Sequence, residues 1–123
     1  MSNSCAMIQM RMPSTSRLFD MFGEIIICKF PFSSGADSKV RPALILFDLQ
    51  QDALICRITS VPHFGLLDVS INQWQAAGLL KPSVARLDRI VTAEKTIFIR
   101  RLGTLAQQDL ETVLNTWNCH MKL

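Results

Sequence analysis

Hydrophobic and polar positions form short runs between residue 23 and about residue 101, a pattern typical of β-strands separated by turns. Turn-forming residues such as Pro31, Gly35 and Pro62 lie between the runs, and residues 73–77 have the composition of a helical turn. The runs predict strands at residues 24–30, 42–48, 53–60, 67–71, 83–88 and 96–101.

The last part of the chain has a different period. Leu110, Val113, Leu114 and Trp117 follow an i, i+3, i+4, i+7 spacing, which predicts one apolar stripe on a helix over residues 106–119. We therefore expect a mainly β fold, a small curled sheet with a C-terminal helix packed against it.

The first residues show neither pattern. Residues 1–21 are rich in Ser, Met and Asn, and several methionines could serve as internal starts. We expect this segment to be a poorly ordered N-terminal extension or the product of a misassigned start, and residues 22–123 to form one domain.

Composition narrows the class of protein. No apolar run approaches the ~20 residues of a membrane span, and the N-terminus has no secretory apolar core, so we expect a cytoplasmic protein. The 4 cysteines form no C-x-x-C pair, and His63 and His120 have no metal-ligand spacing. These features predict reduced, largely buried thiols and no metal site.

The net charge of +3 is unevenly distributed. Residues 81–101 contain Lys81, Arg86, Arg89, Lys95, Arg100 and Arg101 but only Asp88 and Glu94 as acids. This excess suits an anionic partner, although an ordinary solvated basic face would have the same composition.

Three segments contain candidate site residues. Pro42 favours an extended Arg41 at the start of a strand, where its guanidinium can bind a phosphate or simply close a loop. Thr59 ends another strand, where its hydroxyl can bind a phosphate oxygen or close the next turn. Arg86 and Asp88 share one face of a strand, which permits an ion pair or an acid–base couple around a phosphate.

The order of these segments resembles the MazF/PemK toxins over about residues 22–118. The similar segments are Gly23-Glu24-Ile25, Phe30-Pro31-Phe32, residues 39–46, Ile58-Thr59-Ser60, residues 74–84 with Arg86 and Asp88, and Arg101-Leu102-Gly103 before a helix. The resemblance implies a small SH3-like barrel of the MazF/Kid/CcdB-like kind, a homodimer, single-stranded RNA as substrate and a cognate antitoxin as partner.

The resemblance also implies the site. It carries catalytic roles to Arg41, Thr59, Arg86 and Asp88, and RNA-binding roles to Lys29, Asp37, Lys39, Arg57 and Ser60. Two positions depart from the family. Asp37 stands one position from the glutamate that many relatives have, and Ala106 stands where a Ser or Thr usually caps the helix.

The implied activity is that of a toxin acting as a metal-independent, sequence-selective endoribonuclease without a cofactor. The 2′-hydroxyl of RNA would attack the adjacent phosphate, Arg41 would stabilise charge, and Asp88 would transfer a proton. Two alternatives stay open at this point: a non-cleaving relative that binds RNA or an antitoxin, and a gyrase-poisoning toxin of the same barrel fold.

Overall fold

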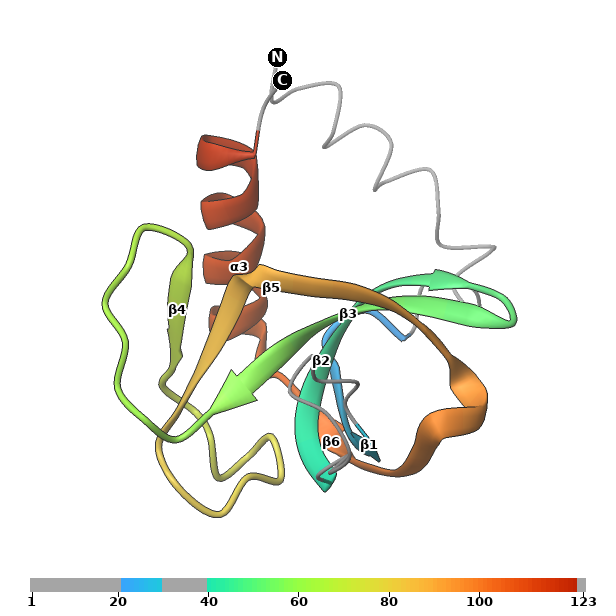
Figure 1. Cartoon of the computed structure of the whole chain (residues 1–123). Helices are drawn as coiled ribbons and strands as arrows, with labels where there is room; N and C mark the ends of the chain where they lie inside the picture. Colours follow the sequence, from blue (N-terminus) through green and yellow to red (C-terminus); the bar gives the residue numbers. More distant parts are fainter. Residues whose placement is uncertain (1–20, 30–39, 122–123) are drawn as a thin grey trace.

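The computed structural model describes residues 21–29 and 40–121. The predicted class, mainly β with a C-terminal helix, is confirmed (Figure 1). The elements are β1 Glu24–Lys29, β2 Val40–Leu49, β3 Asp52–Thr59, β4 Asp68–Ile71, β5 Ser83–Glu94, a 3-10 helix Lys95–Ile97, β6 Phe98–Thr104 and α3 Gln107–His120. The predicted extension at residues 1–21 lies outside the described residues except for Met21.

All six strands belong to one antiparallel sheet with the order β4-β5-β3-β2-β1-β6. The sheet curls strongly, as the barrel prediction requires, but within the described residues its edge strands β4 and β6 do not pair with each other. The fold is therefore an open, barrel-like sheet with α3 against one side (Figure 1).

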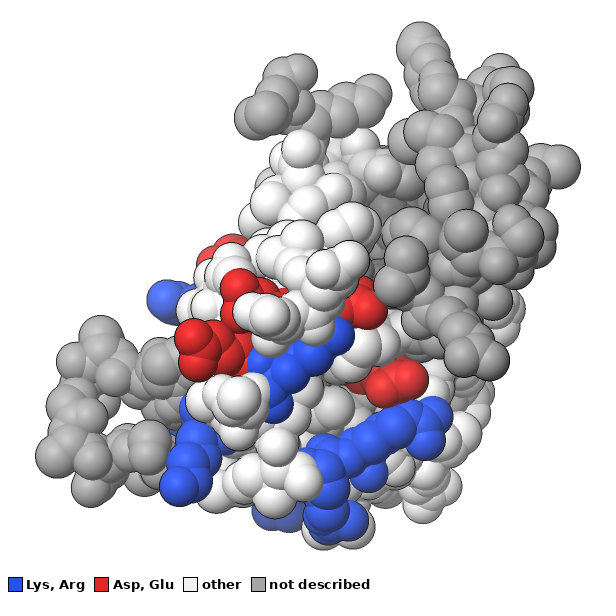
Figure 2. Space-filling view, turned by 90° about the vertical axis from the view of Figure 1, so that its right-hand side faces the viewer, with Lys and Arg blue, Asp and Glu red and all other residues white. Residues whose placement is uncertain are grey.

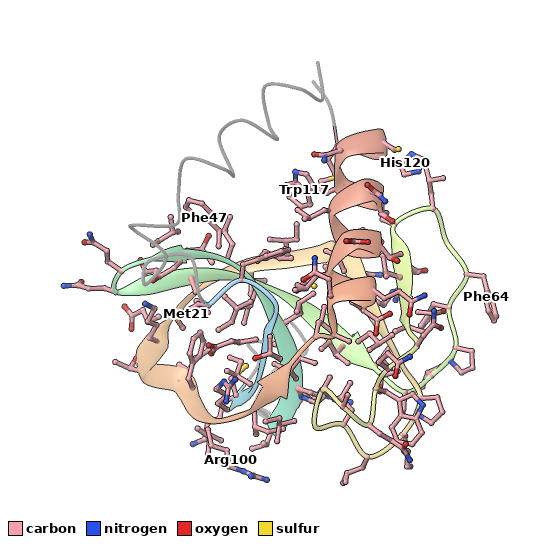
Figure 3. All side chains as sticks on the ribbon, turned by 180° about the vertical axis from the view of Figure 1, so that it is seen from behind. Met21, Phe47, Phe64, Arg100, Trp117 and His120 are labelled. Carbon is pink, nitrogen blue, oxygen red and sulfur yellow. The ribbon has the colours of Figure 1, made fainter. Side chains whose placement is uncertain are left out.

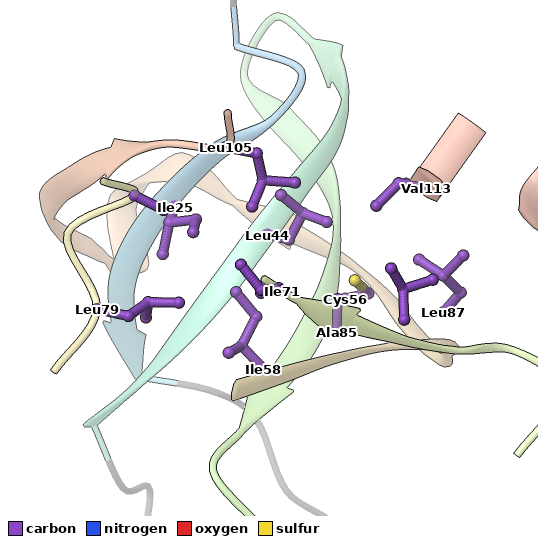
Figure 4. Packing of buried hydrophobic residues seen from close by; sticks show 12 residues of the cluster. Ile25, Leu44, Cys56, Ile58, Ile71, Leu79, Ala85, Leu87, Leu105 and Val113 are labelled. Carbon is purple, nitrogen blue, oxygen red and sulfur yellow. The ribbon is translucent and has the colours of Figure 1, made fainter. Parts of the chain in front are cut away.

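The sheet is buried on both faces. The core beneath α3 contains Leu44, Cys56, Ile58 and Val113, and Figure 4 shows these side chains between the sheet and the helix. The opposite face has a second core that includes Ile45 and Ile55. Alternation along β3 places Cys56 and Ile58 on one face and Ile55 on the other, and all three are buried because the sheet curls around its second face.

Strand β5 is longer than the predicted run at residues 83–88, and it bends. It pairs with β3 in two segments whose register changes between Cys56, which opposes Ile90, and Arg57, which opposes Arg86. The intervening residues, 87–89, form a bulge, and bulges increase local twist and redirect side chains. Asp88 lies in this bulge.

Helix α3 begins after Ala106, which makes no side-chain cap, as its sequence predicts. The predicted apolar stripe is confirmed, since Val113 is buried and Leu110 packs against the same core. The first turn also contains a fully buried acid, Asp109, whose carboxylate accepts hydrogen bonds from the backbone N–H groups of Asn72 (3.1 Å) and Gln73 (2.8 Å). The helix thus fixes the turn that follows β4.

Candidate functional site

A pocket of about 520 Å³ opens at the end of the sheet where β2 begins and β3 ends. We call it the Arg41 pocket. Its polar lining comes from four segments distant in sequence: Arg41, Thr59, Ser60, Lys81, Ser83 and Arg100. Figure 3 shows Arg100 on β6, at the opposite end of the molecule from His120. Cationic and hydroxyl groups in one concavity form a site suited to an anionic group such as a phosphate.

Strand pairing explains why Arg41 and Thr59 meet. The pairs Ala43 with Arg57 and Leu44 with Cys56 place the start of β2 beside the end of β3. Pro42 lies outside that ladder, which suits a residue that has no N–H to donate. Thr59 is 7% exposed, and its Oγ1 accepts a hydrogen bond from the Val61 N–H at 3.1 Å. The hydroxyl therefore closes the turn and can still donate its own hydrogen into the pocket.

Three arginines lie on neighbouring strands beside the Arg41 pocket: Arg41 on β2, Arg57 on β3 and Arg86 on β5. Arg57 opposes Arg86 on β5 and Ala43 on β2, and Arg41 is two residues from Ala43 on the same strand face. Burial lowers the pKa of the Arg57 guanidinium, and the charges of Arg41, Arg86 and Arg89 lower it further. The strand register thus brings Arg41, Arg57 and Arg86 onto one face of three neighbouring strands.

Arg86 has carboxylate partners on both sides. Its Nε lies 3.1 Å from Asp68 Oδ1 on β4 and 3.9 Å from Asp88 Oδ1 in the bulge. The Asp68 side chain is 4% exposed and that of Asp88 is 42% exposed. The ion pair between Arg86 and Asp88 that the sequence permits is present, but the shorter contact is to Asp68.

Asp68 also organises the loop before β4. Its Oδ2 accepts a hydrogen bond from the Gly65 N–H at 2.8 Å. Burial alone would raise the pKa of the Asp68 carboxyl, but the bonds from Gly65 and Arg86 and the charges of Arg86 and His63 hold it below its ordinary value of 3.8. Asp68 is therefore a structural anion that fixes both Arg86 and the loop.

The nine predicted site residues fall into four groups. Arg41, Thr59 and Ser60 line one pocket, while Arg57, Arg86 and Asp88 lie beside it on β3 and β5 and do not line it. Lys29 is exposed at the end of β1, opposite Val40. The predictions for Asp37 and Lys39 lie outside the described residues.

The sequence interpretation missed Lys81 and Arg100 as pocket residues and Asp68 as the partner of Arg86. The basic excess in residues 81–101 included both cations, but only the sheet order shows which members face the pocket. Figure 2 shows basic side chains along the lower part of one face, with acidic and basic side chains side by side in its middle.

The cysteines in the described part of the chain are free thiols. Cys28 and Cys56 are buried and free, and burial raises the pKa of Cys28 to about 11. The described part of the chain contains no group of three or more His, Cys, Asp or Glu side chains that could hold a metal ion. Its helix is too short and polar to cross a membrane.

Comparisons with known proteins agree with this geometry. The sequence matches no curated protein significantly. Among solved structures, the Mycobacterium tuberculosis toxin MazF-mt6 has a TM-score of 0.61 at 22% identity, covering 77% of this chain and 96% of its own. MazF from Deinococcus radiodurans has a TM-score of 0.64 at 17% identity, covering 82% and 94%. A mycobacterial endoribonuclease solved with its cognate antitoxin has a TM-score of 0.65 at 16% identity, covering 82% and 93%.

These structural likenesses establish the fold. The family is established by sequence, because the description "PemK-like, MazF-like toxin of type II toxin-antitoxin system" matches residues 21–118. This chain belongs to the PemK/MazF family of toxins of type II toxin–antitoxin systems.

Proposed function

We propose that this protein is a toxin that cleaves single-stranded RNA as a metal-independent, sequence-selective endoribonuclease. One observation carries the proposal: Arg41 and Thr59, from different strands, line one pocket with Lys81 and Arg100. Family membership and the endoribonucleases among the similar structures support the same activity.

RNA contains its own nucleophile. The 2′-oxygen attacks phosphorus, the bond from phosphorus to the 5′-oxygen breaks, and the products are a 2′,3′-cyclic phosphate and a 5′-hydroxyl. The 2′-hydroxyl gives its proton to a base, and an acid protonates the leaving 5′-oxygen. The protein must also stabilise the extra negative charge on the phosphate.

The pocket residues suit the charge role. The planar guanidinium of Arg41 can donate two parallel hydrogen bonds to non-bridging phosphate oxygens. Thr59 can donate its hydroxyl hydrogen to the same phosphate, because its oxygen already accepts from Val61. Lys81 and Arg100 add positive charge for the flanking phosphates. Because arginine does not deprotonate in proteins, we assign proton transfer to a carboxylate.

Asp88 is our candidate for that proton transfer. Its side chain is 42% exposed, whereas Asp68 is 4% exposed and already accepts from Gly65 and Arg86. Arg41, Arg57 and Arg86 would bind the phosphates of the RNA strand between the Arg41 pocket and Asp88. We also propose RNA-binding roles for Arg57, Ser60, Lys29, Lys39 and Asp37.

We also propose a cognate antitoxin as the protein partner. Two of the similar structures are complexes with antitoxins, and a basic groove of this kind suits an acidic antitoxin segment. We propose that the toxin acts as a homodimer in the cytoplasm, where its RNA substrate is found.

The test is a cleavage assay with purified protein, a long single-stranded RNA and mapping of new 5′ ends. We expect 5′-hydroxyl ends at a defined sequence, undiminished activity in chelator, and no cleavage where the mapped nucleotide is replaced by its 2′-deoxy form. Loss of activity in chelator would overturn the metal-independent mechanism. Growth arrest with DNA damage and intact RNA would instead identify a gyrase poison, and absence of any effect would identify a non-cleaving relative.

A further inference from the structure

A second hollow lies next to the Arg41 pocket and is not used by the mechanism above. It has a volume of about 280 Å³ and shares Ser60 and Ser83 with the Arg41 pocket. We call it the Phe64 pocket. Aromatic and proline side chains line it with a few polar ones, chiefly Phe64, Trp74, Pro62, Pro82, Asn72 and Ser70. The two concavities are therefore neighbours with opposite character, one cationic and one aromatic.

Phe64 is exposed in a way that calls for a physical reason. It is 89% exposed, and Figure 3 shows its side chain pointing away from the body of the protein. Its loop is nevertheless held in place, because Gly65 donates to Asp68 at 2.8 Å and the Asp68 N–H donates back to the Gly65 carbonyl at 3.1 Å. An exposed aromatic ring on an anchored loop is typical of a binding surface.

The second aromatic residue of the Phe64 pocket, Trp74, is anchored independently. Trp74 lies in the turn held by the buried carboxylate of Asp109 through Asn72 and Gln73. Its carbonyl accepts a further hydrogen bond from Leu79 at 3.0 Å, and its ring packs partly against the core beneath α3. Two aromatic side chains from separate, fixed segments thus line one hollow.

This chemistry fits a nucleobase. Single-stranded RNA is recognised by stacking unpaired bases on aromatic rings and by hydrogen bonds to their edges. Phe64 and Trp74 supply the rings, while the Asn72 amide and the Ser70 hydroxyl supply donors and acceptors. We propose that the Phe64 pocket binds one unstacked base of the RNA whose backbone lies in the Arg41 pocket, and that it helps to set the cleavage sequence. This inference rests on the proposed ribonuclease function.

The intrinsic fluorescence of Trp74 can report binding in the Phe64 pocket. The chain has 2 tryptophans, so Trp117→Phe leaves Trp74 as the remaining fluorophore. In this background the probe is a pool of randomised single-stranded RNA with 2′-fluoro groups, which has no 2′-nucleophile and cannot be cut. We expect the probe to quench Trp74 fluorescence. Phe64→Ala should weaken binding by about fivefold to 150-fold, the range for one lost base stack, while Phe64→Tyr should retain binding.

Leu66→Ala is the matched control, because Leu66 is 70% exposed in the same loop but does not line the Phe64 pocket. We expect it to bind like the parent. Equal affinity of the Phe64→Ala and Leu66→Ala proteins would overturn the proposal. So would a change of oligomeric state in Phe64→Ala with unchanged RNA affinity, since the face would then join two copies of the chain.

A second readout separates this inference from the ribonuclease proposal. Mapping of 5′ ends should show that Phe64→Ala loses base preference at one position near the cut. If cleavage depends on Arg41 but Phe64→Ala changes neither affinity nor preference, the base pocket is wrong and the ribonuclease stands. If no RNA is cut but binding of the fluoro-RNA depends on Phe64, the pocket stands and the ribonuclease is wrong.

Discussion

Two arginines on the same sheet differ in their surroundings. Arg41 lies near the start of β2 and lines a concavity of about 520 Å³ with three hydroxyl residues and two further cations. Arg86 lies on β5 between two carboxylates, at 3.1 and 3.9 Å, and does not line that concavity. The concavity around Arg41 can admit a phosphate, whereas Arg86 already has carboxylate oxygens as neighbours. We therefore propose Arg41 as the phosphate-binding group and Arg86 as a group that positions its neighbours.

Substitution of Arg41 should lower the rate of RNA cleavage more than any other single change. Arg41→Ala should lower the cleavage rate by about 10²–10³, because it removes a preorganised donor from the site where negative charge develops. Its thermal unfolding should change little, which circular dichroism can measure. Arg101→Ala is the matched control, since Arg101 is a 57% exposed cation on β6 that does not line the pocket. Equal activity of the two variants would remove the distinction between Arg41 and the other arginines.

The next largest loss of cleavage rate should follow substitution of Asp88, the exposed carboxylate beside Arg86. Asp88→Asn should lower the cleavage rate by about 100-fold, the lower end of the range for general acid–base catalysis. It should leave stability nearly unchanged, because a 3.9 Å contact with a 42% exposed side chain contributes little to folding. The assay is single-turnover cleavage across pH. A parental rate and pH profile would show that another group transfers the proton.

Thr59 should have a smaller effect on activity. Thr59→Val removes the hydroxyl but keeps the shape of the side chain, and it should slow cleavage by about 10- to 100-fold, as expected for a lost hydrogen bond to a charged group. Thr59→Ser should retain most of the activity, because it keeps both the turn and the donor. Parental cleavage by Thr59→Val would mean that the hydroxyl only closes the turn.

Asp68 should affect stability and not chemistry. Asp68→Asn leaves Arg86 without its closest carboxylate, so unfolding in denaturant should require about 1–3 kcal/mol less. Because folding lowers the pKa of Asp68, its contribution is fully present above the ordinary value of 3.8 and is lost as pH falls toward the lower folded value. The variant should therefore show a weaker loss of stability in that acidic range. An unchanged acid dependence would contradict this role.

The sequence predicted the elements well because their signals are local. Alternation identified the strands, and the spacing of Leu110, Val113 and Trp117 identified α3. Two features could not be read locally. The bulge at residues 87–89 depends on how β5 meets β3, and the second buried face depends on the curl of the whole sheet.

The site was only partly predictable for a similar reason. Arg41 and Thr59 were identified through their positions at strand ends, where the family resemblance also placed them. The pair of Arg86 with Asp68 joins residues 18 positions apart, and Lys81 and Arg100 reach the pocket from a loop and an edge strand. Spacing along the chain cannot indicate which of several basic residues share a concavity, because that depends on the order of strands in the sheet.

The central claim is that Arg41 and Thr59 hold the same phosphate. A double-mutant cycle on single-turnover RNA cleavage, with Arg41→Lys, Thr59→Val and the double variant, measures this directly. The account predicts that the double variant is slowed by clearly less than the product of the two single effects, because each change disrupts the same bound phosphate. Fully multiplicative effects, or a double variant as fast as the parent, would contradict it.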